Sequence, residues 1–213
     1  MRKPRSEILI AELPNHLILR GNNRRRLFSY PKDYRTFLWH LGRAAEETNC
    51  LVHSLCLMTN HVHNLTTPPS VDAASKCIAR VAQRYAQLRN AQRNGSGKLF
   101  EQRFYSKPVE TDDYLLAATL YIEANPIRAG VVTNALDYPW STYPLHAGCP
   151  ERSAVPRQLW APSRWYLSLG HSARERARAY CELFDAYVGQ RPIDDDGDRY
   201  TRRLLRPNGS RAT

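Results

Sequence analysis

The sequence of 213 residues has no long uncharged apolar run and few cysteines. A membrane-spanning helix needs roughly 18 or more consecutive apolar residues, and no stretch of the chain approaches that length. The five cysteines are odd in number and form no Cys-x-x-Cys pair, which argues against a disulfide framework and a thiolate zinc site. The first apolar run is cut short by Glu12 and Pro14, so it does not resemble a secretory signal. These absences favour a cytoplasmic protein.

Lysine is also scarce, because 26 of the 31 basic residues are arginine in a chain of formal net charge +11. The planar guanidinium of arginine makes forked contacts with phosphate, and neutralising phosphates releases counterions. A polyanion, most simply nucleic acid, is therefore the expected partner. A basic protein without such a partner remains the alternative. Hydrophobic residues make up 42% of the chain, enough for one main folded domain.

Apolar periodicity predicts the order strand, helix, two strands, helix, strand, helix. The expected ranges are a strand at 13–20, a helix at 30–49, a hairpin at 50–69, a helix at 70–94, a strand at 98–110 and a helix at 112–125. Pro126 is expected to end the last of these helices. This order predicts an α+β fold, an antiparallel β-sheet with packed helices. A further helix is expected at 172–188.

The stretch LMTNHVHNL, residues 57–65, sets two histidines around one valine in an otherwise apolar run. On a strand, side chains at i and i+2 project from the same face. His61 and His63 should therefore stand together while Val62 enters the core. Paired imidazoles can bind one divalent metal ion through a nitrogen each. On this motif alone, two half-exposed histidines without a ligand remain the alternative.

The helix expected at 112–125 offers the groups that such a metal site would still need. Tyr121 and Asn125 are four residues apart and hence neighbours on one helical face. Asn125 could supply an amide oxygen to the metal, and Tyr121 could present its hydroxyl as a nucleophile. Most of the twelve tyrosines must be packing residues, so only the joint pattern with the histidines is informative.

Several blocks of the sequence resemble, in order, the IS200-like single-tyrosine transposases of the HUH superfamily, and in particular the branch associated with repetitive extragenic palindromes (REP). The blocks are LILRGNNRRRLF, SLCLMTNHVHNL, RFYSKPVETDDYLLAATLYIEANPIRAGVV and YPWSTY. Thr59 departs from the pattern, since many members have proline there. The resemblance implies a ferredoxin-like HUH endonuclease domain at 1–145. A C-terminal helical extension at 146–191 and a mobile basic tail at 192–213 would follow it.

By matching motifs, the resemblance implies roles for individual residues. His61 and His63 would be metal ligands, Asn125 the third ligand, and Tyr121 the nucleophile that forms a 5′-phosphotyrosine with single-stranded DNA. These ligands suit Mg²⁺ or Mn²⁺. The expected activity is metal-dependent cleavage and strand transfer at palindromic repeat hairpins. A catalytically inactive hairpin-binding regulator and a replication-initiation nickase are the alternatives.

Basic residues on two segments are expected to contact the DNA. They are Arg20, Arg24, Arg25 and Arg26 after the first strand, and Arg103 and Lys107 before the tyrosine helix. For the first group a solvated loop is the alternative. Arg128, just after the expected end of that helix, is left without an assigned role.

Aromatic residues and the C-terminal tail offer further candidate DNA contacts. Trp140, with Tyr138 and Tyr143, could stack on unpaired bases, although such a cluster is more often part of a core. Arg202 and Arg203 in the tail could contact a DNA hairpin or lie in a disordered segment. The extra C-terminal segment favours a monomer over a homodimer.

Overall fold

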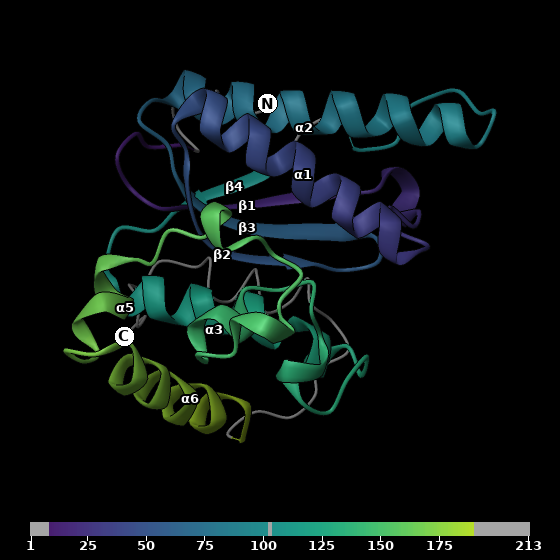
Figure 1. Ribbon diagram of the computed structural model, residues 1–213. Coiled ribbons are helices and arrows are strands. Elements are labelled where there is room, and N and C mark those ends of the chain that lie inside the picture. Colours follow the sequence, from purple (N-terminus) through teal and green to yellow (C-terminus); the bar gives the residue numbers. More distant parts are fainter. Residues whose placement is uncertain (1–8, 102–103, 190–213) are drawn as a thin grey trace, which may run out of the picture.

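The computed structural model describes residues 9–101 and 104–189 and has an α+β architecture (Figure 1). The first part of the chain forms β1 (Asn15–Arg20), α1 (Pro31–Thr48), β2 (Leu51–Leu57), β3 (His61–Thr67), α2 (Val71–Gln92), β4 (Tyr105–Pro108) and α3 (Asp112–Arg128). The second part adds α4 (Tyr143–His146), α5 (Arg164–Ser168) and α6 (Ala173–Gly189), with short 3₁₀ turns between them. The predicted fold class and the predicted order of elements are confirmed.

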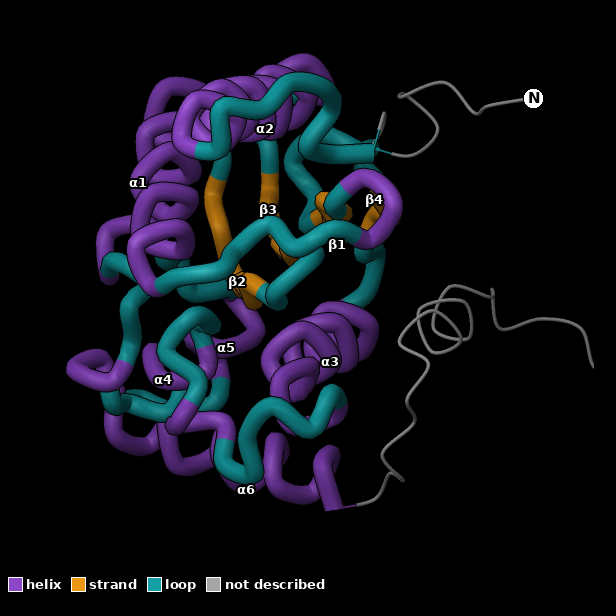
Figure 2. Tube along the Cα trace, turned by 90° about the vertical axis from the view of Figure 1, so that its right-hand side faces the viewer, coloured by secondary structure: helices purple, strands orange, loops and turns teal. Residues whose placement is uncertain are grey.

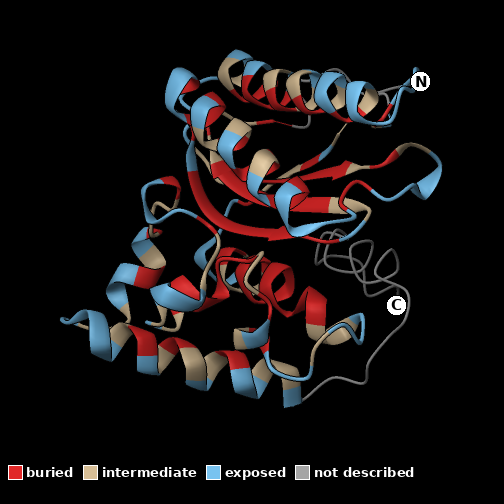
Figure 3. Ribbon diagram, turned by 45° about the vertical axis from the view of Figure 1, so that its right-hand side comes forward, coloured by how far each residue is buried: buried red, intermediate tan, exposed pale blue. Residues whose placement is uncertain are grey.

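The strands form one antiparallel sheet in the order β2-β3-β1-β4 (Figure 2). In this register Ile18 of β1 pairs with His63 of β3 on one side and Tyr105 of β4 on the other. α1 and α2 cover one face of the sheet, where Leu17 and Val62 are buried. α3 packs on the opposite face and is itself mostly buried, between the sheet and α6 (Figure 3).

Segments that follow α3 cover the outer edge of β2. The backbone N–H of Leu57 donates to the carbonyl of Trp140 (2.9 Å), and that of Thr142 donates to the carbonyl of Leu55 (2.9 Å). Further along, the N–H of Ala161 donates to the carbonyl of Val52 (2.8 Å). An unpaired edge strand is a template for pairing with another chain. Here residues that follow α3 in the same chain cover much of the outer edge of β2.

One predicted helix end is wrong, because α3 passes through Pro126 and ends at Arg128. Proline has no N–H for the carbonyl of Ile122, four residues earlier. The side-chain amide of Asn125 donates instead to the carbonyls of Tyr121 (2.7 Å) and Ile122 (3.4 Å). The carbonyl that proline leaves without a backbone donor thus has a partner, and the helix continues far enough to include Arg128.

Much of the arginine charge on α2 is paired within the protein. Arg89 is only 3% exposed and contacts Asp33 of α1 at 2.8 Å. Arg80 and Arg84 contact Glu47 at 3.0 and 3.5 Å. This helix therefore offers less charge to a polyanion than its sequence indicates.

The aromatic cluster near residue 140 belongs to the core. Tyr138 and Tyr143 are each 6% exposed, and the Trp140 ring stacks on Tyr34 with centroids 4.5 Å apart. Base stacking by this cluster is therefore the weaker interpretation.

No helix of the described chain is long and apolar enough to cross a membrane. Arg202 and Arg203 lie outside the described residues.

Candidate active site

His61 and His63 lie side by side on β3, as their spacing predicted. Their ring centroids are 4.8 Å apart. Val62 between them is 1% exposed and belongs to the core under α1 and α2. The two imidazoles therefore occupy the face of the sheet on which α3 packs.

Tyr121 of α3 lies against this histidine pair. Its ring meets that of His63 edge-on, with centroids 5.6 Å apart. The guanidinium carbon of Arg128 lies 5.3 Å from the centroid of the Tyr121 ring. This contact places a cation over the face of the Tyr121 ring. Arg128, which had no assigned role, therefore belongs to the surroundings of the tyrosine.

Asn125 follows one helical turn after Tyr121 and is 8% exposed. Because its amide nitrogen donates to the backbone carbonyls described above, its oxygen is the atom that remains to act as an acceptor or ligand. The same side chain therefore supports the helix at Pro126 and offers an oxygen one turn from the tyrosine.

Neighbouring side chains orient the ring nitrogens of both histidines. The Nδ1 of His61 lies 2.7 Å from the Oδ1 of Asn60, which can only accept, so Nδ1 carries the proton and Nε2 the lone pair. The Nδ1 of His63 lies 3.0 Å from the Nε2 of His16. Histidines that bind metals commonly have their other ring nitrogen held in this way. His61 can therefore offer Nε2 as a ligand, and His63 can do so in the tautomer whose Nδ1 donates to His16.

His16 is a site residue that the sequence-based prediction missed. It lies on β1, is 3% exposed and contacts the rings of both His63 and Tyr121, the latter with centroids 6.1 Å apart. Burial, with a smaller effect of nearby Lys107, lowers the pKa of His16 to about 4. Burial, followed by the effect of His61, also lowers the pKa of His63 well below its usual value. Both rings are therefore neutral near pH 7, the form in which imidazole binds metals.

The side chains present suit a divalent ion with oxygen and imidazole ligands. Within residues 9–101 and 104–189, no three His, Cys, Asp or Glu side chains are arranged to hold one metal ion. His16 therefore supports His63 and does not complete a histidine triad. Two imidazoles and the amide oxygen of Asn125, as ligands of one ion, would leave coordination positions for water or phosphate oxygens, a set that Mg²⁺ or Mn²⁺ accepts.

Positive charge borders the site on two strands and one loop. Arg20 pairs with His61 across β1 and β3, and Lys107 pairs with His16 across β4 and β1. The Nζ of Lys107 lies 4.8 Å from the centroid of the Tyr114 ring, and burial lowers the pKa of this lysine. The loop after β1 exposes its arginines, Arg24, Arg25 and Arg26. Arg103 lies outside the described residues.

Comparison with known proteins identifies the family and the fold of the chain. The family model for IS200-like transposases matches residues 10–125, more than half of the chain. A solved structure of a REP-associated tyrosine transposase bound to a REP hairpin is similar in fold, with a TM-score of 0.58 and 17% sequence identity. The similarity covers 76% of this chain and 93% of that one. No curated protein sequence matches significantly.

Proposed function

The chain belongs to the family of IS200-like transposases, and from this premise we propose that it is a metal-dependent nuclease and strand transferase for single-stranded DNA. The observation that carries the proposal is the contact of Tyr121 with His63, 5.6 Å between ring centroids, next to a second histidine on the same strand. A nucleophile beside two candidate metal ligands is an arrangement for phosphoryl transfer.

In the proposed reaction, the Tyr121 hydroxyl loses its proton to water and its oxygen forms a bond to phosphorus. The bond from phosphorus to the 3′ oxygen breaks, and that oxygen takes up a proton. The products are a 5′-phosphotyrosine and a free 3′-hydroxyl. A divalent ion, when bound, would polarise the scissile phosphate and offset charge on its oxygens.

Strand transfer is the same reaction in reverse. A phenol has an ordinary pKa of about 10, so its anion is a workable leaving group. The 3′-hydroxyl of another strand attacks the phosphotyrosine, and the phenolate of Tyr121 departs with Arg128 near its ring. Strands are joined without an external energy source, because the phosphotyrosine keeps the energy of the broken phosphodiester.

We propose palindromic repeat hairpins as the substrate, by analogy with the similar solved transposase, which is bound to a REP hairpin. The rival proposals are a hairpin-binding regulator without activity and a replication-initiation nickase. The complete set of His61, His63, Tyr121 and Asn125 counts against the first. Membership in a transposase family counts against the second.

The proposal is tested by incubating the protein with labelled single-stranded hairpin DNA from repeats near its gene, with Mn²⁺ or with EDTA. We expect a covalent protein–DNA band on a denaturing gel with Mn²⁺ and none with EDTA. Tight binding without any band, across several hairpins and metals, would support the regulator instead.

Arg24 and Arg25, in the exposed loop after β1, are expected to bind DNA through phosphate. Replacing either with alanine should weaken hairpin binding, and the slope of log K against log salt should fall by about 0.7 for each single-strand phosphate that the variant no longer neutralises. Arg80→Ala is the matched control, because Arg80 is paired with Glu47 at 3.0 Å. If the slope of log K against log salt, measured by fluorescence anisotropy, is the same for the loop variants and the control, the loop does not contact the DNA.

We also propose that the protein acts as a monomer. Tyr121 and His63 of one chain already lie together, and residues after α3 cover the edge of β2 that would otherwise be open to a second copy. Light scattering should give a mass near 24.5 kDa. A stable dimer would contradict this proposal.

A further inference from the structure

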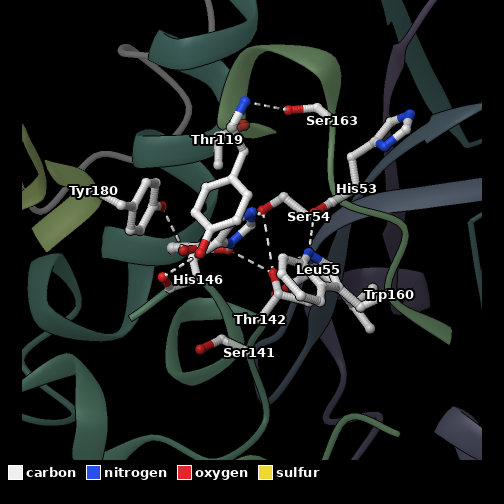
Figure 4. Close-up of polar contacts among 12 residues, drawn as sticks. His53, Ser54, Leu55, Thr119, Ser141, Thr142, His146, Trp160, Ser163 and Tyr180 are labelled. Atoms are coloured by element: carbon white, nitrogen blue, oxygen red, sulfur yellow. Dashed lines mark hydrogen bonds and ion pairs between the residues drawn. The ribbon is translucent and has the colours of Figure 1, made fainter. Parts of the chain in front are cut away.

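A buried carboxylate lies on the tyrosine helix, two residues after Tyr121. Glu123 is 0% exposed. Its Oε1 accepts hydrogen bonds from Ser54 Oγ (3.2 Å), Thr142 Oγ1 (2.5 Å) and His146 Nδ1 (2.8 Å), and its Oε2 accepts one from the hydroxyl of Tyr180 (2.5 Å). Figure 4 shows these four donors converging from different parts of the chain.

The donors come from elements on several sides of α3. Ser54 belongs to β2, Thr142 and His146 lie at α4, and Tyr180 belongs to α6. His146 is further held by stacking on Tyr180, with centroids 4.7 Å apart, and its carbonyl accepts from the hydroxyl of Tyr166 (2.9 Å). The carboxylate therefore connects the sheet, the tyrosine helix and the C-terminal helices at one point.

A buried carboxylate is costly to desolvate, and replacing a whole buried ion pair with apolar side chains is often neutral or stabilising, so such a group is weak evidence for stability alone. A carboxylate with several donors instead fixes the position and orientation of the helix that carries it. Each of its hydrogen bonds is formed only at a suitable distance and angle. Residues two apart on a helix point about 200° from each other. Tyr121 thus faces the histidines while Glu123 fixes the other side of α3.

We propose that Glu123 is a positioning residue, which holds α3 at the rotation and depth that bring Tyr121 against His63. This proposal rests on the proposed function of Tyr121. Three of the donors, Thr142, His146 and Tyr180, lie after residue 125, where the match to the family model ends. The C-terminal helices are therefore part of the catalytic unit.

Tyr180→Phe and Glu123→Gln in the full chain test the proposal. Tyr180→Phe removes one hydroxyl and keeps the ring, whereas Glu123→Gln keeps the shape and removes the charge. Misplacing a reacting group by about 1 Å can cost about 100-fold in rate. We expect adduct formation in a single turnover, at saturating Mn²⁺ and DNA, to slow by about tenfold in Tyr180→Phe and about 100-fold in Glu123→Gln. The Kd for the hairpin should stay within about twofold.

Asp33→Asn is the matched control, since it weakens a buried ion pair with Arg89 in the layer of α1 and α2. It should lower the Tm without slowing adduct formation at a temperature where all variants are folded. Wild-type rates in both test variants would overturn the positioning proposal alone, as would an equal loss of rate in Asp33→Asn. Absence of any adduct from wild-type protein would overturn the proposed function itself.

Discussion

Tyr121→Phe is expected to abolish the covalent protein–DNA adduct while hairpin binding changes by no more than about twofold. Phenylalanine keeps the ring that contacts His63, His16 and Arg128, and it lacks only the oxygen that would bond to phosphorus. Removing a nucleophile typically costs at least about 10⁴-fold in rate, because no other group performs its step. Denaturing gels and anisotropy titrations on one protein preparation measure the two quantities.

Tyr114→Phe is the control for this variant. Tyr114 lies on the same helix, two turns earlier, with the Nζ of Lys107 over its ring. Its loss should leave the adduct at the wild-type level. An adduct at the wild-type level in Tyr121→Phe would refute the assignment of the nucleophile.

His61→Ala and His63→Ala are expected to abolish metal-dependent cleavage together with the stabilisation of the folded protein by Mn²⁺. A ligand that binds only the native state raises the free energy of unfolding by about 2.7 kcal/mol at one hundred times its Kd. The wild-type Tm should therefore rise with Mn²⁺, and the Tm of either variant should not. Because His63 is 3% exposed and bonded to His16, its variant should also be less stable without metal.

His53→Gln separates loss of metal binding from loss of a buried histidine. His53 is 8% exposed, and its ring bonds to the carbonyl of Ala161 (2.7 Å) and the hydroxyl of Thr67 (2.8 Å), away from the tyrosine. This variant should lose stability but keep the response of the Tm to Mn²⁺. Cleavage at the wild-type rate by His61→Ala would show that His61 is not a metal ligand.

The parts of the fold that follow from local periodicity could be predicted from the sequence. The two-residue period of a β-strand predicted His61 and His63 on one face of the sheet and Val62 on the other. The spacing of four residues predicted Tyr121 and Asn125 on one face of a helix. The end of α3 could not be predicted from Pro126 alone. The side-chain amide of Asn125 bonds to the carbonyl that proline leaves open, and this contact depends on a rotamer that no propensity specifies.

Contacts between distant parts of the chain account for the rest. His16 meets His63 across 47 positions of sequence, and Glu123 meets Tyr180 across 57. A histidine within an apolar strand and a glutamate within an apolar helix were visible signals, but their partners depend on strand register and helix packing. The same limit applies to Arg89, because its buried pairing with Asp33 depends on how α1 and α2 pack together.

The position of the covalent bond to DNA tests the central claim most directly. After reaction with a short hairpin oligonucleotide, nuclease and trypsin should leave one modified peptide, 104–128, because trypsin does not cut between Lys107 and Pro108. This peptide contains Tyr105, Tyr114 and Tyr121, and fragmentation in a mass spectrometer distinguishes them. We predict a nucleotide on Tyr121 alone, formed with Mn²⁺ and absent with EDTA. A nucleotide on any other residue would contradict the proposed active site.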